Sequence, residues 1–316
     1  MTEKLNIVFM GTPDFAVGIL DHLVENGMHI VGVVTAPDKP AGRGRKIHTS
    51  AVKDYALQKG LTVLQPANLK SEEFLQELQS LQADLQIVVA FRMLPKVVWD
   101  MPKYGTFNLH ASLLPEYRGA APINWAIING EKETGVTTFF LDDQIDTGKM
   151  ILQKKTNIGT NETAGELHDR LMNLGKETVL ETVRLIAENK VDLQTQPNGN
   201  HKTAHKLNKE NCQINWELPA GEIHNHIRGL SPYPAAWATL VNDEEKIPVK
   251  IYQSAFEKTH HDYNVGKVIT DNKKHISVAV SDGFLHILEL QFPGKKRMET
   301  VALLNGVKLT EQAYFK

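Results

Sequence analysis

The chain is organised around the stretch Asn108-Leu-His110-Ala-Ser-Leu-Leu-Pro115-Glu-Tyr-Arg-Gly-Ala-Ala-Pro122. Asn108 and His110 stand two positions apart at the end of an apolar run, so a strand there would point both side chains to one face. Pro115 lacks an N–H and fixes its φ, which excludes the continuation of a central strand. The chain must therefore turn directly after it has presented an amide and an imidazole together.

A second polar motif, Asp142-Asp-Gln-Ile-Asp146-Thr-Gly148, follows the apolar run at residues 135–141, which predicts a further strand. Asp146 lies in the loop after that strand, so we expect its carboxylate to approach the same strand ends. A lone histidine or aspartate at such a place is more often a buried, hydrogen-bonded side chain or a turn cap. The joint pattern of the two motifs favours a catalytic site instead.

The three polar groups of these motifs suit acyl transfer to an amine. An amide N–H and an imidazolium can stabilise the oxyanion of a tetrahedral intermediate, and a carboxylate can orient and charge the imidazole or receive the amine proton. This chemistry requires no hydroxyl or thiol nucleophile.

Strand and helix patterns alternate through the first part of the chain. Apolar runs predict strands at 5–10, 30–35, 61–64 and 84–90, and helix patterns occupy 14–26, 50–60 and 71–79. This alternation predicts an α/β fold, a Rossmann-like, mostly parallel sheet with helices on both faces. Gly11-Thr-Pro-Asp14 lacks the three glycines of the dinucleotide fingerprint, so a nicotinamide cofactor is not indicated.

The pattern changes in the second part of the chain. Thr163-Ala-Gly-Glu166 resembles a capping box at the start of a long helix that we expect to end near Asn189. Short strands and turns then begin at Leu207, with Asp282-Gly283 as a hairpin signal, and they predict a smaller all-β, OB-like barrel. We expect a catalytic domain at 1–189, a polar linker at 190–206 and the barrel domain at 207–316.

Two basic clusters stand out against a nearly neutral chain. Residues 36–48 are rich in proline and glycine, which predicts a loop without regular structure, and they contain Lys39, Arg43, Arg45 and Lys46. This loop follows a strand, and in an α/β sheet that places it at the carboxyl edge, where ligands bind. Most charge clusters of this size are solvated surface, but the position favours phosphate contact. A second cluster, Lys295-Lys296-Arg297, is either a charged turn or a further phosphate contact.

Composition excludes several classes of protein. The net charge of −2 and the pI near 6.7 exclude a bulk polycation, so nucleic acid would have to bind at local patches. A single cysteine, Cys212, precludes an internal disulfide and fits a reducing compartment. No long apolar stretch predicts a membrane span, and no histidine has companions at metal-ligand spacing. We expect a cytoplasmic protein without a membrane segment or a metal.

The motifs together resemble those of enzymes that use 10-formyltetrahydrofolate as a formyl donor. From end to end, the chain resembles the methionyl-tRNA formyltransferase family, including Ala41-Gly-Arg43-Gly, Ile227-Arg-Gly-Leu-Ser-Pro-Tyr-Pro and Gly294-Lys-Lys-Arg. The resemblance implies a Rossmann-like formyltransferase domain followed by an OB-like domain, with both domains contacting initiator Met-tRNA. The implied reaction transfers a formyl group to the amino group of methionyl-initiator tRNA for translation initiation, and we expect the enzyme to act as a monomer.

The resemblance also implies residue roles. Carried over by motif, Asn108, His110 and Asp146 are catalytic. The folate would contact the turn Ser112, Leu113, Leu114 and Pro115, and the tRNA would contact Arg43, Arg45 and Lys46 in one domain and Lys295, Lys296 and Arg297 in the other. Two departures, Phe91-Arg-Met93 in place of Ala-Tyr-Gly-type residues and Ala111 in place of a common glycine, could reshape the folate wall.

Other members of the same donor class remain as alternatives. Sugar-nucleotide N-formyltransferases, glycinamide ribonucleotide formyltransferases and formyltetrahydrofolate hydrolases would share the Asn/His/Asp core. A non-catalytic tetrahydrofolate-binding or RNA-binding protein is a further alternative, but the intact Asn108, His110 and Asp146 argue against it. The leading alternative function is formyl transfer from the same donor to an amino sugar nucleotide.

Overall fold

The computed structural model describes residues 4–41 and 46–316. The chain divides into two compact units. The first unit comprises residues up to Gly119, Thr134–Thr156 and His168–Thr203, and the second comprises Ala120–Glu133, Asn157–Leu167 and Ala204–Lys316. The domain boundaries given by the sequence, at 189 and 206, stay a prediction.

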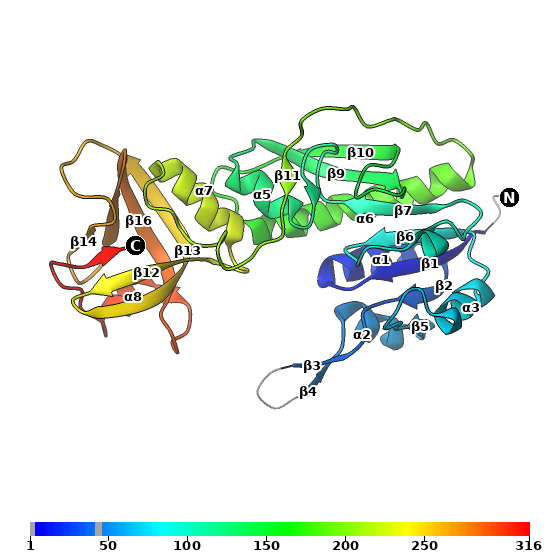
Figure 1. The fold of residues 1–316 in the computed structure, drawn as a ribbon, viewed down its shortest axis with the longest axis horizontal. Helices are drawn as coiled ribbons and strands as arrows, with labels where there is room; N and C mark the ends of the chain where they lie inside the picture. The colour runs from blue at the N-terminus through cyan, green and yellow to red at the C-terminus, as the bar shows by residue number, and fades with distance from the viewer. Residues whose placement is uncertain (1–3, 42–45) are drawn as a thin grey trace. The chain divides into compact units, whose positions relative to one another are not determined.

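The first unit is built on a seven-stranded sheet (Figure 1). In spatial order its strands are β10 (Met150–Asn157), β9 (Glu133–Phe140), β7 (Thr106–His110), β6 (Leu85–Val89), β1 (Asn6–Gly11), β2 (His29–Val34) and β5 (Val63–Leu64). The pairs β1–β2, β1–β6, β2–β5 and β6–β7 are parallel, and β7–β9 is antiparallel. The predicted mostly parallel α/β sheet is therefore confirmed.

Helices cover both faces of this sheet. They are α1 (Asp14–Glu25), α2 (Ala51–Gln58), α3 (Glu72–Ser80), α4 (Lys96–Trp99) and α6 (Ala164–Ala187). Val8 and Met10 of β1 belong to one buried cluster together with Phe74 of α3 and Val98 of α4. On the other face, a Cβ atom at Gly175 of α6 would lie 2.8 Å from Leu109 of β7. Burial on both faces explains why the strands are continuous apolar runs.

The register of β7 determines to which face of the sheet Asn108 and His110 point. Leu109 pairs with Thr138, and Thr138 Oγ1 lies 2.8 Å from Thr182 Oγ1 of α6, so both residues face that helix. Side chains alternate along a strand, so Asn108 and His110 point to the opposite face. The period-two prediction for these two residues is confirmed.

The basic loop is more regular than the sequence predicts. β3 (Lys39–Ala41) pairs antiparallel with β4 (Lys46–His48), so the expectation of no regular structure over 36–48 was wrong at both ends. A proline is tolerated at the edge of a short ribbon, where its missing N–H breaks no central ladder, and Pro40 pairs with Ile47 there. Residues 42–45 lie outside the described residues.

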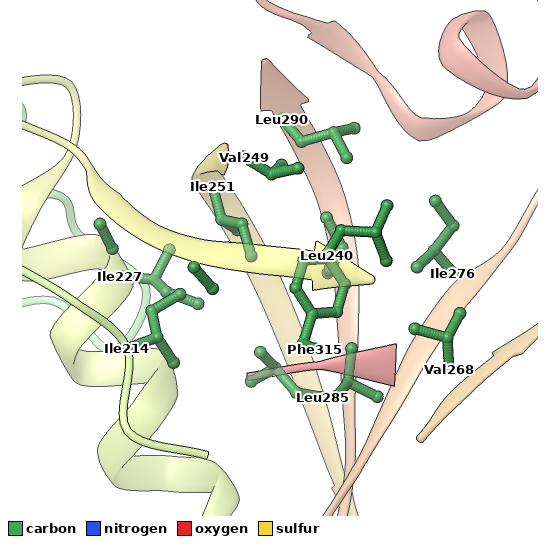
Figure 2. Packing of buried hydrophobic residues seen from close by; sticks show 14 of the residues in the cluster. Ile214, Ile227, Leu240, Val249, Ile251, Val268, Ile276, Leu285, Leu290 and Phe315 are labelled. Atoms are coloured by element: carbon green, nitrogen blue, oxygen red, sulfur yellow. The ribbon is translucent and has the colours of Figure 1, made fainter. Parts of the chain in front are cut away.

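The second unit contains an antiparallel barrel. Its strands lie in the order β14 (Val268–Thr270), β15 (Ile276–Val280), β16 (Gly283–Gln291), β13 (Glu245–Lys258), β12 (Ala236–Asn242) and β18 (Tyr314–Phe315), with β17 (Met298–Glu299) on β16. Backbone bonds from Val268 N to Ala313 O (3.0 Å) and from Phe315 N to Gly266 O (2.8 Å) join the two end strands. The sheet thus closes on itself almost completely, around apolar side chains such as Leu240, Ile251 and Leu285 (Figure 2).

The chain also contains several shorter elements. They are β8 (Arg118–Gly119), α5 (Pro122–Ile128), β11 (Thr203–Ala204), α7 (Ala220–Leu230) and α8 (Thr300–Leu304). No helix in the described part of the chain has the length and apolar character that a membrane span needs.

Asp282 caps α7 from the hairpin between β15 and β16. Pro219 precedes the helix and makes no side-chain cap, and Asp282 Oδ1 accepts a hydrogen bond from Ala220 N–H at 2.7 Å. This bond, with the Lys258 ammonium 3.2 Å from the carboxylate, holds the pKa of Asp282 below its ordinary value. The hairpin of the barrel therefore fixes the amino end of the helix.

Replacing Asp282 by asparagine removes the negative charge at this helix end and keeps the side-chain shape. We expect the barrel to lose about 0.5 to 1 kcal/mol of stability at pH 7. Because folding lowers the pKa of Asp282, its contribution is present above the ordinary value near 4 and is lost as the pH falls through the folded-state pKa.

Thermal unfolding followed by tryptophan fluorescence at pH 7 and pH 3 checks this prediction. The control is Asp262→Asn, at a fully exposed carboxylate, which should leave the midpoint unchanged. If the difference in unfolding midpoint between wild type and Asp282→Asn is the same at pH 7 and pH 3, the capping role is contradicted.

Candidate active site

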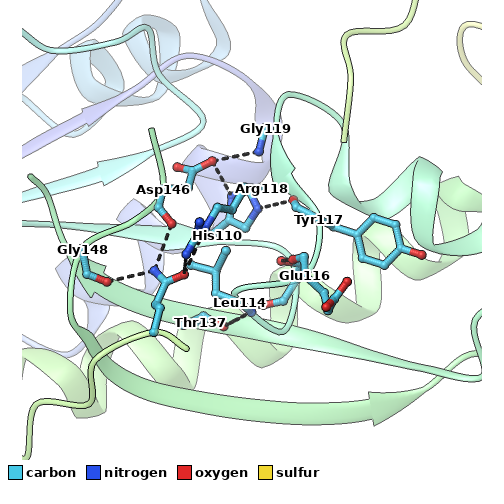
Figure 3. A network of polar contacts seen from close by, with 11 residues as sticks. His110, Leu114, Glu116, Tyr117, Arg118, Gly119, Thr137, Asp146 and Gly148 are labelled. Carbon is cyan, nitrogen blue, oxygen red and sulfur yellow. Dashed lines mark hydrogen bonds and ion pairs between the residues drawn. The ribbon is translucent and has the colours of Figure 1, made fainter. Parts of the chain in front are cut away.

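His110 is held at the carboxyl end of β7 by a hydrogen bond at one ring nitrogen, and the other ring nitrogen faces a carboxylate. Its side chain is 6% exposed, and Nε2 lies 2.8 Å from the carbonyl oxygen of Tyr117 (Figure 3). A carbonyl oxygen only accepts, so Nε2 carries the proton of this hydrogen bond. Nδ1 faces Asp146 Oδ2 at 3.9 Å. Nδ1, which bears the lone pair of this tautomer, therefore points toward the Asp146 carboxylate.

Asp146 reaches His110 from a loop that folds back over the sheet. β9 is antiparallel to β7 and ends beside Phe107, so the loop after β9 starts at the far end of β7 from His110. Asp146 adopts a φ of +56°, and its Oδ2 accepts the Gly119 N–H at 2.9 Å. Gly148 permits the close return, because a Cβ atom there would lie 1.7 Å from the Phe140 carbonyl oxygen.

Asn108 supplies an amide on the same face as His110. The side chain is half-buried, and its Oδ1 is buried without a hydrogen-bond partner among the described residues. Buried polar atoms are normally paired, and an amide oxygen only accepts, so an N–H or O–H donor of a bound molecule would complete the bonding of this atom. The structure thus brings Asn108, His110 and Asp146, which are separated by up to 38 positions in the sequence, to one place.

The turn after β7 is fixed by hydroxyl groups. Thr137 Oγ1 donates to the Ser112 carbonyl at 2.7 Å and accepts from Leu114 N–H at 3.2 Å and Gln153 Nε2 at 3.0 Å. Ser112 Oγ donates to the Glu116 carbonyl at 2.6 Å. Ser112 and Leu114 are buried, and Leu113 is half-buried. A ligand at this turn would therefore meet its backbone and Leu113, with the Leu114 side chain inside the core.

The segment predicted as a linker also lines the site. Glu116 accepts the Lys202 N–H at 2.9 Å and pairs with His201 Nδ1 at 2.9 Å, and the Tyr117 N–H donates to the Lys202 carbonyl at 2.6 Å. Burial raises the pKa of Glu116, but the hydrogen bonds from His201 and Lys202 outweigh it, so the pKa lies below its ordinary value. Gln196 of the same segment binds the Asp146 loop. These residues have no periodic pattern, so no sequence signal could have identified them.

The loop after β6 has one residue turned to solvent and one turned to the protein. Met93 is 68% exposed, and the Arg92 guanidinium donates to the carbonyl of Ala67 at 3.1 Å and to that of Pro66. Phe91 is half-buried against the cluster that contains Leu94. Only Met93 of the unusual Phe91-Arg-Met93 stretch thus offers freely accessible apolar surface at this edge.

The structure describes only some of the residues predicted to contact tRNA. Arg43 and Arg45 lie outside the described residues, and Lys46 is described only as part of the backbone of β4. Lys295 and Lys296 are exposed. Arg297 forms an ion pair with Glu289 and stacks on Tyr252 at 4.5 Å, and its pKa is raised chiefly by the hydrogen bond to Glu289. Among the described residues, the two lysines are therefore the charges of this cluster that have no ion pair.

No group of three or more His, Cys, Asp and Glu side chains in the described ranges is arranged to hold a metal ion. The site consists of an amide, an imidazole and a carboxylate on a backbone fixed by hydrogen bonds. Such a set can bind an oxyanion and move a proton, which are the requirements of acyl transfer.

Two family models match the chain. The formyl transferase model matches residues 5–183, and the model of the formyl transferase C-terminal domain matches residues 206–308. A methionyl-tRNA formyltransferase of Flavobacterium johnsoniae is 60% identical over 312 residues, covering 98% of this chain and 99% of the relative. One of Bacteroides thetaiotaomicron is 55% identical over 314 residues and covers 98% of both chains.

Solved structures share the fold at lower identity. An N-formyltransferase of Helicobacter canadensis, in complex with folinic acid and dTDP-3-aminofucose, gives a TM-score of 0.66 at 23% identity and covers 90% of this chain and 98% of that one. The structure of HypX of Aquifex aeolicus in complex with tetrahydrofolic acid gives a TM-score of 0.64 at 17% identity and covers 98% of this chain and 49% of that one.

Thr137→Val tests whether the turn after β7 depends on the Thr137 hydroxyl. The change keeps the side-chain shape but leaves the Leu114 N–H and the Ser112 carbonyl without their partner. We expect a loss of about 2 kcal/mol of stability, the scale of leaving buried polar groups unpaired.

Urea unfolding of the full chain measures this loss. Thr134→Val is the control, since Thr134 lies on the same strand and is also buried, and its hydroxyl has no hydrogen bond within the described structure. Equal stability of the two variants would show that the turn does not need the Thr137 hydroxyl.

Proposed function

Because this chain belongs to the formyl transferase family, we propose that it transfers a formyl group from 10-formyltetrahydrofolate to the free amino group of methionyl-initiator tRNA, for translation initiation. The observation that carries the proposal is the identity of 55 to 60% with methionyl-tRNA formyltransferases over nearly the whole of both chains. The arrangement of Asn108, His110 and Asp146 supports it. The proposal includes a cytoplasmic location and a monomeric enzyme.

The reaction follows from the three polar side chains. The amine lone pair attacks the formyl carbon and produces a tetrahedral oxyanion, which the Asn108 amide and a protonated His110 stabilise. Collapse of this intermediate breaks the bond between the carbon and N10 of the folate. The amine gives up one proton, N10 receives one, and His110 with Asp146 beside Nδ1 is placed to carry this proton.

The donor would lie against the carboxyl edge of β6 and β7. These parallel neighbours end in the loop with the exposed Met93 and the turn with the half-buried Leu113, which supply apolar surface for a pterin ring. The backbone of Ser112, Leu114 and Pro115 completes the predicted folate contact. The tRNA would bind through Arg43, Arg45 and Lys46 and through Lys295, Lys296 and Arg297.

One observation favours a second acceptor. The fold is shared over most of its length with an N-formyltransferase that was solved with a dTDP-amino sugar. An amino sugar nucleotide is therefore the alternative acceptor. A formyl-transfer assay that offers Met-tRNA, an amino sugar nucleotide and water decides between them, and the proposal requires Met-tRNA to be the preferred acceptor.

Removing either oxyanion-binding group should stop most of the chemistry. We expect Asn108→Ala and His110→Ala to lower the turnover of Met-tRNA by about 100-fold or more, the scale seen when an oxyanion-hole donor is lost. Folate affinity should change much less, since neither side chain is assigned to the donor contact.

Single-turnover formylation and a folate titration measure the two effects. His29→Ala is the control, at an exposed histidine that begins β2. Near-normal formylation by His110→Ala would show that the role is wrongly assigned.

The basic clusters should act on tRNA binding alone. Each lost phosphate contact should flatten the slope of log affinity against log salt by roughly 0.7 to 0.9. Arg43→Ala should lower formylation of Met-tRNA strongly and leave folate binding unchanged. The double change Lys295→Ala and Lys296→Ala should mainly raise the Michaelis constant for tRNA.

Kinetics across a salt series check this expectation. The matched control changes Lys273 and Lys274 to alanine, two exposed lysines in the turn that Asp271 organises by accepting their backbone N–H groups. Wild-type slopes and rates in both test variants would favour a smaller acceptor than tRNA.

A further inference from the structure

Gln196 has every polar group of its side chain engaged within the first unit. It is 5% exposed, and Nε2 donates to the carbonyls of Asp146 and Gly148, both at 2.9 Å. Oε1 accepts from Arg118 Nε at 3.1 Å and from Arg118 Nη2 at 2.6 Å. An amide has two N–H donors and an oxygen with two lone pairs, so these four bonds use its full capacity.

The Gln196 amide bonds two segments, one that carries the Asp146 carboxylate and one that holds the His110 ring. Asp146 and Gly148 lie in the loop that folds back over the sheet and carries the carboxylate. Arg118 lies between Tyr117, whose carbonyl accepts from His110, and Gly119, whose N–H binds Asp146 Oδ2. One side chain thus ties the backbone that presents the carboxylate to the backbone that holds the imidazole.

The loop that carries Asp146 needs external hydrogen bonds to keep its conformation. Asp146 has a φ of +56°, a conformation that is unfavourable for a non-glycine residue unless its surroundings impose it. The bonds from Gln196 to the carbonyls of Asp146 and Gly148 hold the backbone that directly follows this torsion, and the bond from Gly119 N–H holds the Asp146 side chain. Glutamate at this position would be isosteric but could not donate to either carbonyl, and leucine or methionine could make none of the four bonds.

We propose that Gln196 is a positioning residue for formyl transfer, acting through Asp146, so that the segment 190–206 completes the active site. The inference rests on the proposed function. Gln196 sets the separation between the Asp146 carboxylate and His110 Nδ1, which is 3.9 Å in the structure. Its side chain is buried and bonds only protein groups, so its loss should lower turnover and leave both Michaelis constants nearly unchanged.

The test compares Gln196→Met and Gln196→Glu with wild type in the full chain, using Met-tRNA and 10-formyltetrahydrofolate. We expect kcat to fall by about 10- to 100-fold in both variants, the scale of a misplacement of about 1 Å in an active site. The Michaelis constants should stay within about threefold, because ground-state binding is preserved. Gln86→Met is the matched control, since Gln86 is a fully buried amide on β6 that bonds Thr106 at the other end of β7. It should keep the wild-type kcat.

A double-mutant cycle separates positioning from a general structural role. If Gln196 acts through the Asp146 carboxylate, Gln196→Met should lower kcat in the wild-type background and change it by less than about twofold in an Asp146→Asn background. Equal losses in both backgrounds would overturn the proposal. So would a kcat within about threefold of wild type in folded Gln196→Met or Gln196→Glu.

The remaining outcomes are also decisive. If Gln196→Met does not fold, as judged by circular dichroism, Gln196→Glu still tests the proposal, because it keeps the shape and the acceptor for Arg118 and loses only the two donors. If the wild-type chain formylates no Met-tRNA, the proposed function fails. If wild type formylates and the Gln196 variants do so equally well, only the positioning role fails.

Discussion

The hydrogen bond from His110 Nε2 to the Tyr117 carbonyl constrains the rest of the site. It fixes which ring nitrogen carries the proton of the neutral imidazole, and it turns Nδ1 toward Asp146. The carbonyl must therefore be held rigidly, and the chain does this with Tyr117 N–H on Lys202 and Glu116 on His201. A catalytic histidine at the end of one strand thus depends on a segment about 90 residues later in the chain.

Local backbone strain gathers around the same point. Ala90 at the end of β6, Tyr117 and Asp146 have φ values of 48°, 61° and 56°, which non-glycine residues seldom adopt. Such residues persist only where surrounding bonds over-determine them, and they concentrate at functional sites. Gln196 donates to the Asp146 carbonyl, and Tyr117 is held through its N–H on the Lys202 carbonyl and its own carbonyl on His110. Thr137 fixes the adjacent turn with its whole polar capacity. The rigidity of the site therefore comes from a few fully bonded side chains, and apolar packing beneath the sheet supplies the support.

The second unit obeys a different constraint. Its antiparallel sheet must leave no long open edge, and the bonds between the ends of β14 and β18 achieve this. The loop between β16 and β17 carries the basic cluster of this unit. Lys295 and Lys296 stay exposed, and Arg297 is held by Glu289 and Tyr252. In a chain with a net charge of −2, an anionic partner would then be attracted by a local patch and not by the field of the whole protein.

Elements with a short-range pattern could be derived from the sequence alone. The strand and helix alternation, the shared face of Asn108 and His110, the capping box of Thr163 with Glu166, and the Asp282-Gly283 hairpin each follow from a period or a turn residue, and the structure contains all of them. Only the tertiary structure decided the antiparallel direction of β9, the burial of Leu114 and the contacts of Gln196. The physical reason is that each of these depends on contacts between distant residues, from 23 positions apart for Leu114 and Thr137 to 78 for Arg118 and Gln196, and a single contact of this kind imposes no period on the sequence around it.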